Sequence, residues 1–124
     1  MFDAILRELI EAVPGARGAV FCDNLGEAVN SVGASGRAAP SELTDFDLRV
    51  AGAQLATPLD LARAALATDY GALQECVIGG SHETLLVHLL PEGYYLVLCL
   101  EPGAITARGM FWLRQIAKRL AVEI

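Results

Sequence analysis

Two apolar segments joined by a tight turn constrain the fold of this chain more than any other feature. The first, residues 82–90, reads His-Glu-Thr-Leu-Leu-Val-His-Leu-Leu, and the second, residues 94–100, reads Tyr-Tyr-Leu-Val-Leu-Cys-Leu. Between them, Pro91 fixes its own φ and Gly93 can take a positive φ, so the chain reverses within a few residues. Strands that are apolar on both faces belong in the middle of a sheet covered on both sides. The covering layers must come from the rest of the chain or from a second copy.

Composition indicates one domain that buries part of its surface against a partner. The chain has 124 residues, enough for a single domain, 1–124, whose core needs neither disulfide nor metal. Hydrophobic residues make up 54% and charged residues only 19%. The net charge of −6 disfavours nucleic acid or an anionic membrane as the main partner. No signal peptide is recognisable and the longest apolar run, Leu85–Leu100, is interrupted, so we expect a cytoplasmic protein without membrane insertion.

Sequence motifs for catalysis or cofactor binding are absent. The chain has no GxxxxGK[ST], GxSxG or HExxH pattern, and its carboxylates are scattered. Cys22, Cys76 and Cys99 lie in separate apolar runs without CxxC spacing, so we expect them to be buried, reduced thiols. His82 and His88 form no Cys/His pair with zinc-site spacing. We therefore expect a protein that is not an enzyme and that has no catalytic residues, no cofactor and no metal.

Hydrophobic periodicity and turn residues predict the order of the elements. In chain order they are a helix over 2–13, strands over 16–22 and 27–32, a small polar loop over 33–40, a helix over 45–68, strands over 73–79, 82–90 and 94–100, and a last helix after Gly103. This α-β-β-α-β-β-β-α order gives a five-stranded antiparallel sheet, ordered 2-1-5-4-3, if sequential neighbours pair and the fifth strand closes on the first. The third strand is then an edge that neither proline nor lysine protects, which favours pairing with a second copy.

The helix over 45–68 carries two apolar strips. Thr44 is its expected N-cap, and a kink or short break is expected with Thr57 as a new cap and Pro58 at the first helical position. The main stripe consists of Leu48, Ala51, Gly52, Leu55, Leu59, Ala62 and Leu66. The smaller strip consists of Val50, Ala53, Leu61, Ala64 and Ala65. This second strip indicates either another helix packed alongside or an alanine-rich surface that serves helix propensity.

The last helix combines an apolar face with a basic one. The apolar face consists of Gly109, Met110, Leu113, Ile116, Ala117, Leu120 and Ile124. The opposite face gathers Arg108, Arg114, Lys118 and Arg119 around Phe111. Cations late in a helix usually complement its dipole, and an exposed aromatic among them is alternatively a partner-binding spot.

The order of elements and two segments, Asp23–Ala28 at the first hairpin and Glu101–Arg108 before the last helix, resemble the Roadblock family (dynein light-chain Roadblock domains), in particular its bacterial mutual gliding protein B type. The resemblance implies an α+β sandwich of profilin-like topology, with the first and last helices on one face of the sheet and the long helix on the other. It implies an obligate dimer whose third strands pair across a two-fold axis and whose long helices lie side by side. Such dimers bind small Ras-like GTPases as activators or scaffolds, or serve as adaptors.

These implications define two predicted surfaces. The dimer interface is predicted at Leu73, Glu75, Val77, Gly79, Val50, Ala53, Leu61 and Ala64. The GTPase-binding surface is predicted at Arg49, Gln54, Thr57 and Asp60. We expect a homodimeric regulator or scaffold that stimulates GTP hydrolysis, if at all, by ordering the GTPase's own groups, since no arginine can be assigned as a finger. The alternatives are an adaptor without effect on nucleotide turnover and, more distantly, a small-molecule sensor domain.

Overall fold

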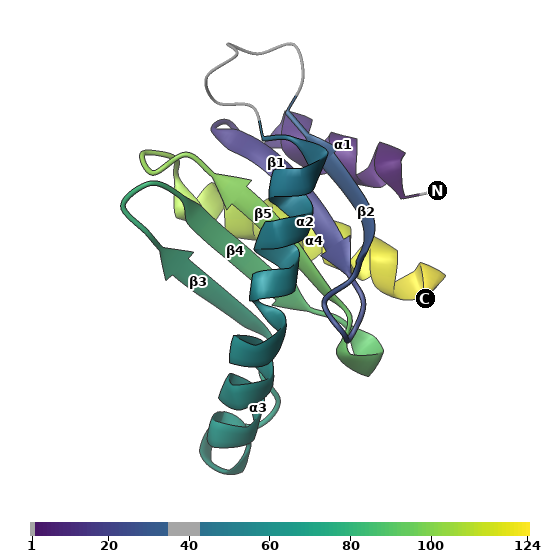
Figure 1. Cartoon of the computed structure of the whole chain (residues 1–124), viewed down its shortest axis with the longest axis vertical. Coiled ribbons are helices and arrows are strands. Elements are labelled where there is room, and N and C mark those ends of the chain that lie inside the picture. Colours follow the sequence, from purple (N-terminus) through teal and green to yellow (C-terminus); the bar gives the residue numbers. More distant parts are fainter. Residues whose placement is uncertain (1, 35–42) are drawn as a thin grey trace.

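A computed structural model describes residues 2–34 and 43–124 of the chain. Its centre is a five-stranded antiparallel sheet with the predicted order β2-β1-β5-β4-β3 (Figure 1). The strands are β1 Ala16–Cys22, β2 Ala28–Gly33, β3 Glu75–Gly79, β4 Thr84–Leu89 and β5 Tyr95–Leu100. All six residues of the middle strand β5 are buried, as its apolar sequence predicts. Positions 35–40 of the predicted polar loop lie outside the described residues.

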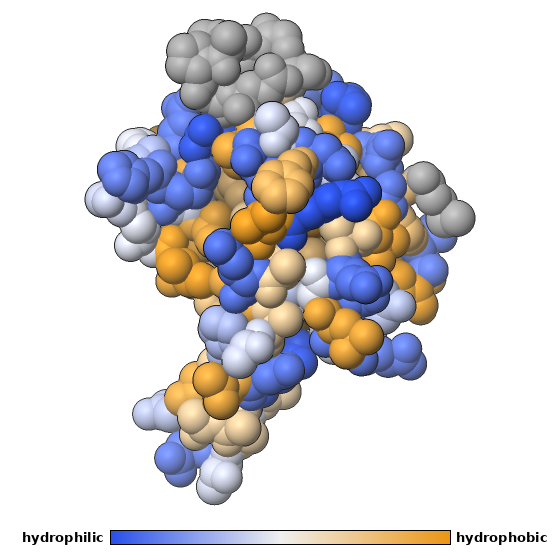
Figure 2. Space-filling view, viewed as in Figure 1, coloured by the Kyte–Doolittle hydropathy of each residue, from blue (hydrophilic) through white to orange (hydrophobic). Residues whose placement is uncertain are grey.

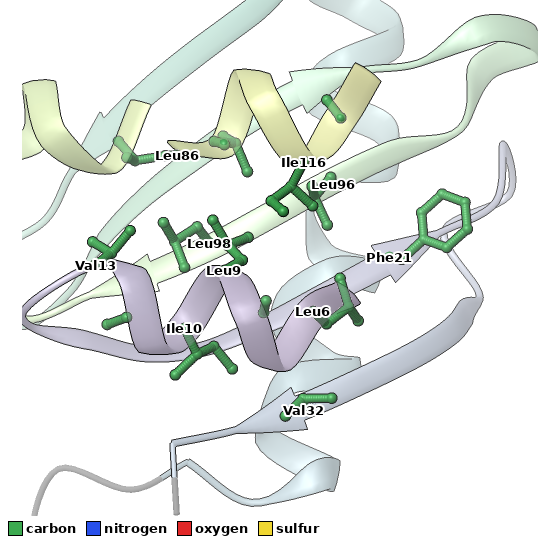
Figure 3. Packing of buried hydrophobic residues seen from close by; sticks show 14 of the residues in the cluster. Leu6, Leu9, Ile10, Val13, Phe21, Val32, Leu86, Leu96, Leu98 and Ile116 are labelled. Carbon is green, nitrogen blue, oxygen red and sulfur yellow. The ribbon is translucent and has the colours of Figure 1, made fainter. Parts of the chain in front are cut away.

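Helices α1 (Asp3–Ala12) and α4 (Thr106–Glu123) cover one face of the sheet, as predicted. Their apolar stripes and the strands beneath form a core cluster that Figure 3 shows at close range. Its members include Leu6, Leu9, Phe21, Leu98 and Ile116, each at most 1% exposed. α4 approaches the sheet closely at Gly109, where a Cβ would lie 2.8 Å from Cδ1 of Leu86. Ile124, predicted on the apolar face, is 44% exposed because it lies beyond the end of α4.

Two helices, α2 (Asp45–Gln54) and α3 (Ala56–Tyr70), lie on the opposite face, where the sequence predicts one helix with a kink or short break. Thr44 caps α2 as predicted, and its hydroxyl accepts from the N–H of Asp47 at 3.1 Å. The carboxylate of Asp47 accepts in return from the N–H of Thr44 at 3.0 Å. The core under these helices is a second cluster: Val20, Cys22, Leu48, Leu55, Leu59, Val87, Leu89, Tyr95, Val97 and Cys99.

The break between α2 and α3 lies at Leu55, two residues before the predicted cap. The prediction of a break is confirmed, but Thr57 lies inside α3 and Pro58 is its third residue, so their predicted roles as cap and first helical residue were wrong. A proline lacks the N–H that would bond to the carbonyl four residues earlier, and its ring crowds that carbonyl. For Pro58 this carbonyl belongs to Gln54, and α2 ends at that residue.

α3 leaves the sheet after its first turns. Leu59 is 3% exposed, whereas Leu66, predicted on the same buried stripe, is 37% exposed. Figure 1 shows α3 projecting past the end of the sheet, close to where β3 begins. Leu48, Gly52, Leu55 and Leu59 of the main stripe are therefore buried, Ala51 and Ala62 are half-buried, and Leu66 lies where α3 has passed the end of the described sheet.

β3 and β4 each begin two residues later than predicted, and β2 and β5 each begin one residue later. β3 starts at Glu75, and the side chain of Leu73 packs instead against the second core cluster. β4 starts at Thr84 rather than at His82, because the N–H of Gly80 donates to the carbonyl of Glu83 at 2.8 Å and closes the turn. The other turns follow the prediction. Gly26 has a φ of +86° and Gly93 a φ of +84°.

Candidate functional site

β3 presents an open edge at one end of the sheet. The carbonyl of Gln74 accepts from the last residue of β4, and the N–H of Gly80 donates to the residue just before β4, each at 2.8 Å. Even-numbered residues here therefore bond to β4, and bonding residues alternate in an antiparallel pair. The outward-pointing N–H and C=O groups belong to Glu75, Val77 and Gly79. These are the three predicted interface residues that lie within β3.

The side chains of β3 meet different surroundings on the two faces of the sheet. Glu75 turns toward α4, where its carboxylate accepts from Nε of Arg114 at 2.9 Å and also from Nη2. This guanidinium holds the pKa of Glu75 below its usual range. Val77 shares that side by alternation and is 54% exposed. Ile78, on the α3 side with Cys76, is 41% exposed, so the protomer leaves apolar surface uncovered on both faces of β3.

The predicted interface residues on the helices are all exposed. Leu61 is 66% exposed and Val50 36%, and Ala53 and Ala64 are exposed as well. Figure 2 shows hydrophobic side chains reaching the surface along α2 and α3. Leu73 differs from the rest of the predicted set, because it is half-buried against the protomer's own core.

The four residues predicted to bind a GTPase are exposed around the break between α2 and α3. Arg49 pairs with Asp45 at 3.0 Å, and Asp60 pairs with Arg63 at 3.4 Å. Exposed pairs of this kind add little stability, but Asp45 also accepts from the hydroxyl of Ser31 and so ties Arg49 to β2. A hollow of about 400 Å³ adjoins them, lined by Gly26, Glu27, Ala28, Arg49 and Ala53.

A second hollow, of about 250 Å³, lies between α2 and the strands on the β3 side of the sheet, and we call it the α2 groove. Its lining consists of Leu43, Phe46, Asp47, Val50, Ala51, Gln54, Glu83, Leu85 and Cys99. Oε1 of Glu83 accepts from Arg17 at 2.6 Å, but Oε2 is buried and has no hydrogen-bond partner among the described residues. Burial raises the pKa of Glu83, and the charge of Arg17 partly offsets that effect. The sequence carried no signal for this acceptor, because Arg17 and Glu83 are 66 positions apart.

Tyr95 of β5 supports the joint between α2 and α3 from below. Its hydroxyl donates to the carbonyl of Gly52 at 2.7 Å, and the residue is almost completely buried. The same carbonyl accepts from the N–H of Leu55 at 3.2 Å. Tyr95 thus bonds to one of the last carbonyls of α2, which the break leaves short of regular helical partners. The contact joins residues 43 positions apart and fixes where the exposed helical surface bends.

The three thiols should label at different rates. Burial raises the pKa of Cys22 to about 11 and that of Cys99 to about 12, and both side chains are buried. Burial also raises the pKa of Cys76, but this residue is only half-buried on the edge strand. At pH 8 we expect iodoacetamide to modify Cys76 first, and Cys22 and Cys99 only as the fold opens, because the thiolate is the reactive form. Peptide mass spectrometry over time measures this order, and rapid native labelling of Cys22 or Cys99 would contradict it.

The basic surface of α4 lies on the opposite face of the sheet. Phe111 is 54% exposed and packs edge-on against Trp112, with ring centroids 5.4 Å apart. Arg114 and Arg119 form ion pairs with side chains of β3 and α1, respectively. Two of the four cations are therefore engaged in ion pairs within the protomer, and Phe111 beside Lys118 is the alternative partner-binding spot.

The described residues combine an open strand edge with exposed helix faces, which are features of an interaction surface. Within 2–34 and 43–124, no three His, Cys, Asp or Glu side chains lie close enough together to hold a metal ion. None of the helices in that part of the chain is both long and apolar enough to cross a lipid bilayer.

Comparisons with known proteins agree with this geometry at the level of the fold. No protein-family model matches the sequence, and no curated protein matches it. A Roadblock/LC7 domain from Streptomyces avermitilis superposes with a TM-score of 0.78 at 17% identity, over 95% of this chain and 92% of that one. An MglB structure with a tetrameric arrangement superposes with a TM-score of 0.80 at 22% identity, over 95% of this chain and 83% of that one. Gliding protein MglB from Thermus thermophilus superposes with a TM-score of 0.80 at 21% identity, over 95% of this chain and 84% of that one. The chain therefore has the Roadblock/LC7 fold, which confirms the predicted architecture.

Proposed function

We propose that this chain forms a homodimer through β3, and that the dimer binds a small Ras-like GTPase on its α2 and α3 helices as a regulator or scaffold. The observation that carries the proposal is the open edge of β3 beside uncovered apolar side chains. Strand edges with free N–H and C=O groups pair readily unless charge, proline or a covering element prevents it. Within β3, only the side chain of Glu75 is charged, and it is engaged with α4.

In the proposed dimer the two β3 strands run antiparallel about a two-fold axis near Val77. The outward groups of Glu75, Val77 and Gly79 then bond to those of the second copy and continue the sheet from one protomer into the other. The strip of Val50, Ala53, Leu61 and Ala64 is exposed on the two helices that cover one face of this sheet. Of the two explanations for that strip, we favour contact with another helix, because Leu61 and Val50 are apolar beyond what helix propensity requires.

The GTPase part of the proposal rests on the likeness to MglB and on the chemistry of the helical surface. The four residues of the predicted GTPase-binding surface are all exposed, so another protein can contact them directly. Arg49 and Asp60 supply charges of opposite sign that orient a partner. Because Arg49 is already paired with Asp45, we assign it an orienting role rather than that of an arginine finger.

The test is a charge reversal at this surface. Arg49→Glu combined with Asp60→Lys should weaken binding of a Ras-like GTPase from the same organism by about 10- to 100-fold, because both orienting charges are inverted. Calorimetry with the GTPase loaded with a non-hydrolysable GTP analogue measures the affinity. Sedimentation should show that the variant is still a dimer, since neither residue belongs to the β3 edge.

Lys118→Glu is the matched control, because it reverses a charge on the opposite face. Loss of binding in this variant, with none in the double variant, would move the site to Phe111, Arg114 and Lys118 on α4. The rate of GTP hydrolysis in the unmutated complex separates a regulator from an adaptor. A rate equal to that of the GTPase alone would identify an adaptor.

A further inference from the structure

α3 extends the sheet-facing stripe of the helices into solvent. Leu59, Leu66 and Tyr70 are seven and four residues apart, so they share one side of the helix. Their exposure rises along α3 from 3% through 37% to 81%. The helix advances 1.5 Å per residue, so the stripe continues roughly 16 Å past Leu59. The stripe stays on the sheet-facing side of α3, in the part of the helix that projects past the end of the described sheet (Figure 1).

The β3–β4 part of the sheet, in turn, leaves apolar side chains uncovered. Ile78 is 41% exposed there, and Cys76 and Leu85 are half-buried. The α2 groove lies beside them, with Phe46 72% exposed at its rim. Among residues 2–34 and 43–124, α2 flanks this part of the sheet, and no helix lies directly over it.

A two-fold axis at β3 brings the exposed stripe of α3 from one protomer next to the uncovered β3–β4 surface of the other. Only four residues, 71–74, connect the end of α3 to the start of β3, so the tip of α3 lies near that end of the strand. The α2 groove lies toward the other end, because Glu83 follows the β3–β4 turn and Leu85 pairs with Ile78. Antiparallel pairing reverses the direction of the second copy, and the partner's α3 tip then reaches the level of the groove.

Polar groups also match between α3 and the α2 groove. Oε2 of Glu83 is a buried acceptor without a hydrogen-bond partner among the described residues. Leaving a buried acceptor without a hydrogen bond costs free energy. Tyr70 is the last residue of α3, and it places a phenolic hydroxyl at the far end of the stripe. A tyrosine suits a site that combines apolar side chains with an acceptor for its hydroxyl, and the α2 groove offers Phe46, Val50 and Leu85 beside Glu83.

We infer that, in the homodimer proposed above, α3 of each protomer lies on the partner's β3–β4 surface, with the ring of Tyr70 in the partner's α2 groove and its hydroxyl donating to the carboxylate of Glu83. The site is incomplete in one chain, and the second copy supplies the missing side chain. Two such contacts form per dimer, related by the two-fold axis. The contact explains why the apolar stripe continues beyond the protomer's own sheet.

The first experiment measures the dimer dissociation constant by sedimentation equilibrium. Tyr70→Phe should raise it about 10-fold and Tyr70→Ala about 100-fold or more, because both copies lose the contact. Thr68→Ala removes an exposed hydroxyl on the other side of α3 and should leave the constant unchanged. Glu83→Gln should also weaken the dimer, and its effect should shrink in the Tyr70→Phe background, because the two changes remove the same bond.

The second experiment replaces Tyr70 with the photo-crosslinking residue p-benzoylphenylalanine in isotopically labelled chains mixed with unlabelled ones. Irradiation should join position 70 of one isotopic form to a peptide carrying Phe46 or Leu85 of the other. Tyr70 is 81% exposed, so substitutions at this position do not endanger folding of the protomer.

The outcomes separate this inference from the proposed function. An unmutated protein that sediments as a monomer at micromolar concentration would overturn the dimer and with it this contact. A dimer whose dissociation constant is unchanged by Tyr70→Ala, or whose crosslinks join position 70 to its own chain, would overturn the contact alone.

Discussion

Gly52→Val should lower the free energy of unfolding by about 2–3 kcal/mol, a large effect for one added side chain. A Cβ at Gly52 would lie 2.5 Å from Sγ of Cys22 and 3.4 Å from a methyl group of Val20. Both neighbours are completely buried, so neither can move into solvent. α2 would have to move away from β1 and loosen the packing of Leu48. Urea denaturation followed by circular dichroism at fixed protein concentration measures the loss.

The smaller change Gly52→Ala tests the cause. In an exposed helix interior, glycine to alanine stabilises by about 1 kcal/mol, whereas here we expect a net loss because the methyl group meets Sγ of Cys22. Cys22→Ala removes that sulfur, so the double variant should lose less than the two single variants together. A stabilising Gly52→Ala would show that α2 does not lie this close to β1.

Val77→Pro should abolish dimerisation, raising the dissociation constant by about 100-fold or more, while the protomer stays folded. The N–H of Val77 points away from β4, so proline removes no bond of the protomer's own sheet. At a two-fold axis the same substitution deletes two donors, one from each chain, and places two rings in the junction. Sedimentation velocity at micromolar concentration measures the assembly, and circular dichroism measures the fold.

Two neighbouring substitutions serve as controls. Val77→Ala keeps the N–H, so it should weaken the dimer far less than proline does. Ile78→Pro removes an N–H that points toward β4, so it should destabilise the protomer itself. If Val77→Pro sediments like the unmutated protein, β3 is not the junction.

Elements that a local pattern determines were predictable from the sequence. The capping of α2 by Thr44 follows from a threonine three residues before an aspartate. The turn at Asp23–Gly26 follows from the turn preferences of aspartate and glycine. The order of the sheet follows from pairing sequential strands and placing the most apolar run, residues 94–100, in the middle.

Features that depend on distant contacts were not predictable. Thr57 and Pro58 fit a helix start locally, but the break falls at Leu55, next to the carbonyl of Gln54 to which Pro58 cannot donate. The ion pair of Glu75 with Arg114 joins positions 39 apart. The direction of each backbone group in β3 depends on its register with β4, and no periodicity within one strand reveals it. The lone acceptor of Glu83 arises in the same way, from segments that meet only in the folded chain.

α3 also has a consequence for folding. It buries one residue, Leu59, fewer than any other of the four described α-helices. A helix of 15 residues is marginally stable in water without tertiary contacts. In an isolated protomer the amide hydrogens of α3 should therefore exchange with solvent much faster than those of α4. Whatever covers α3 stabilises its helical state by mass action, so helix formation there and association are one linked equilibrium, set by the concentration of the covering chain.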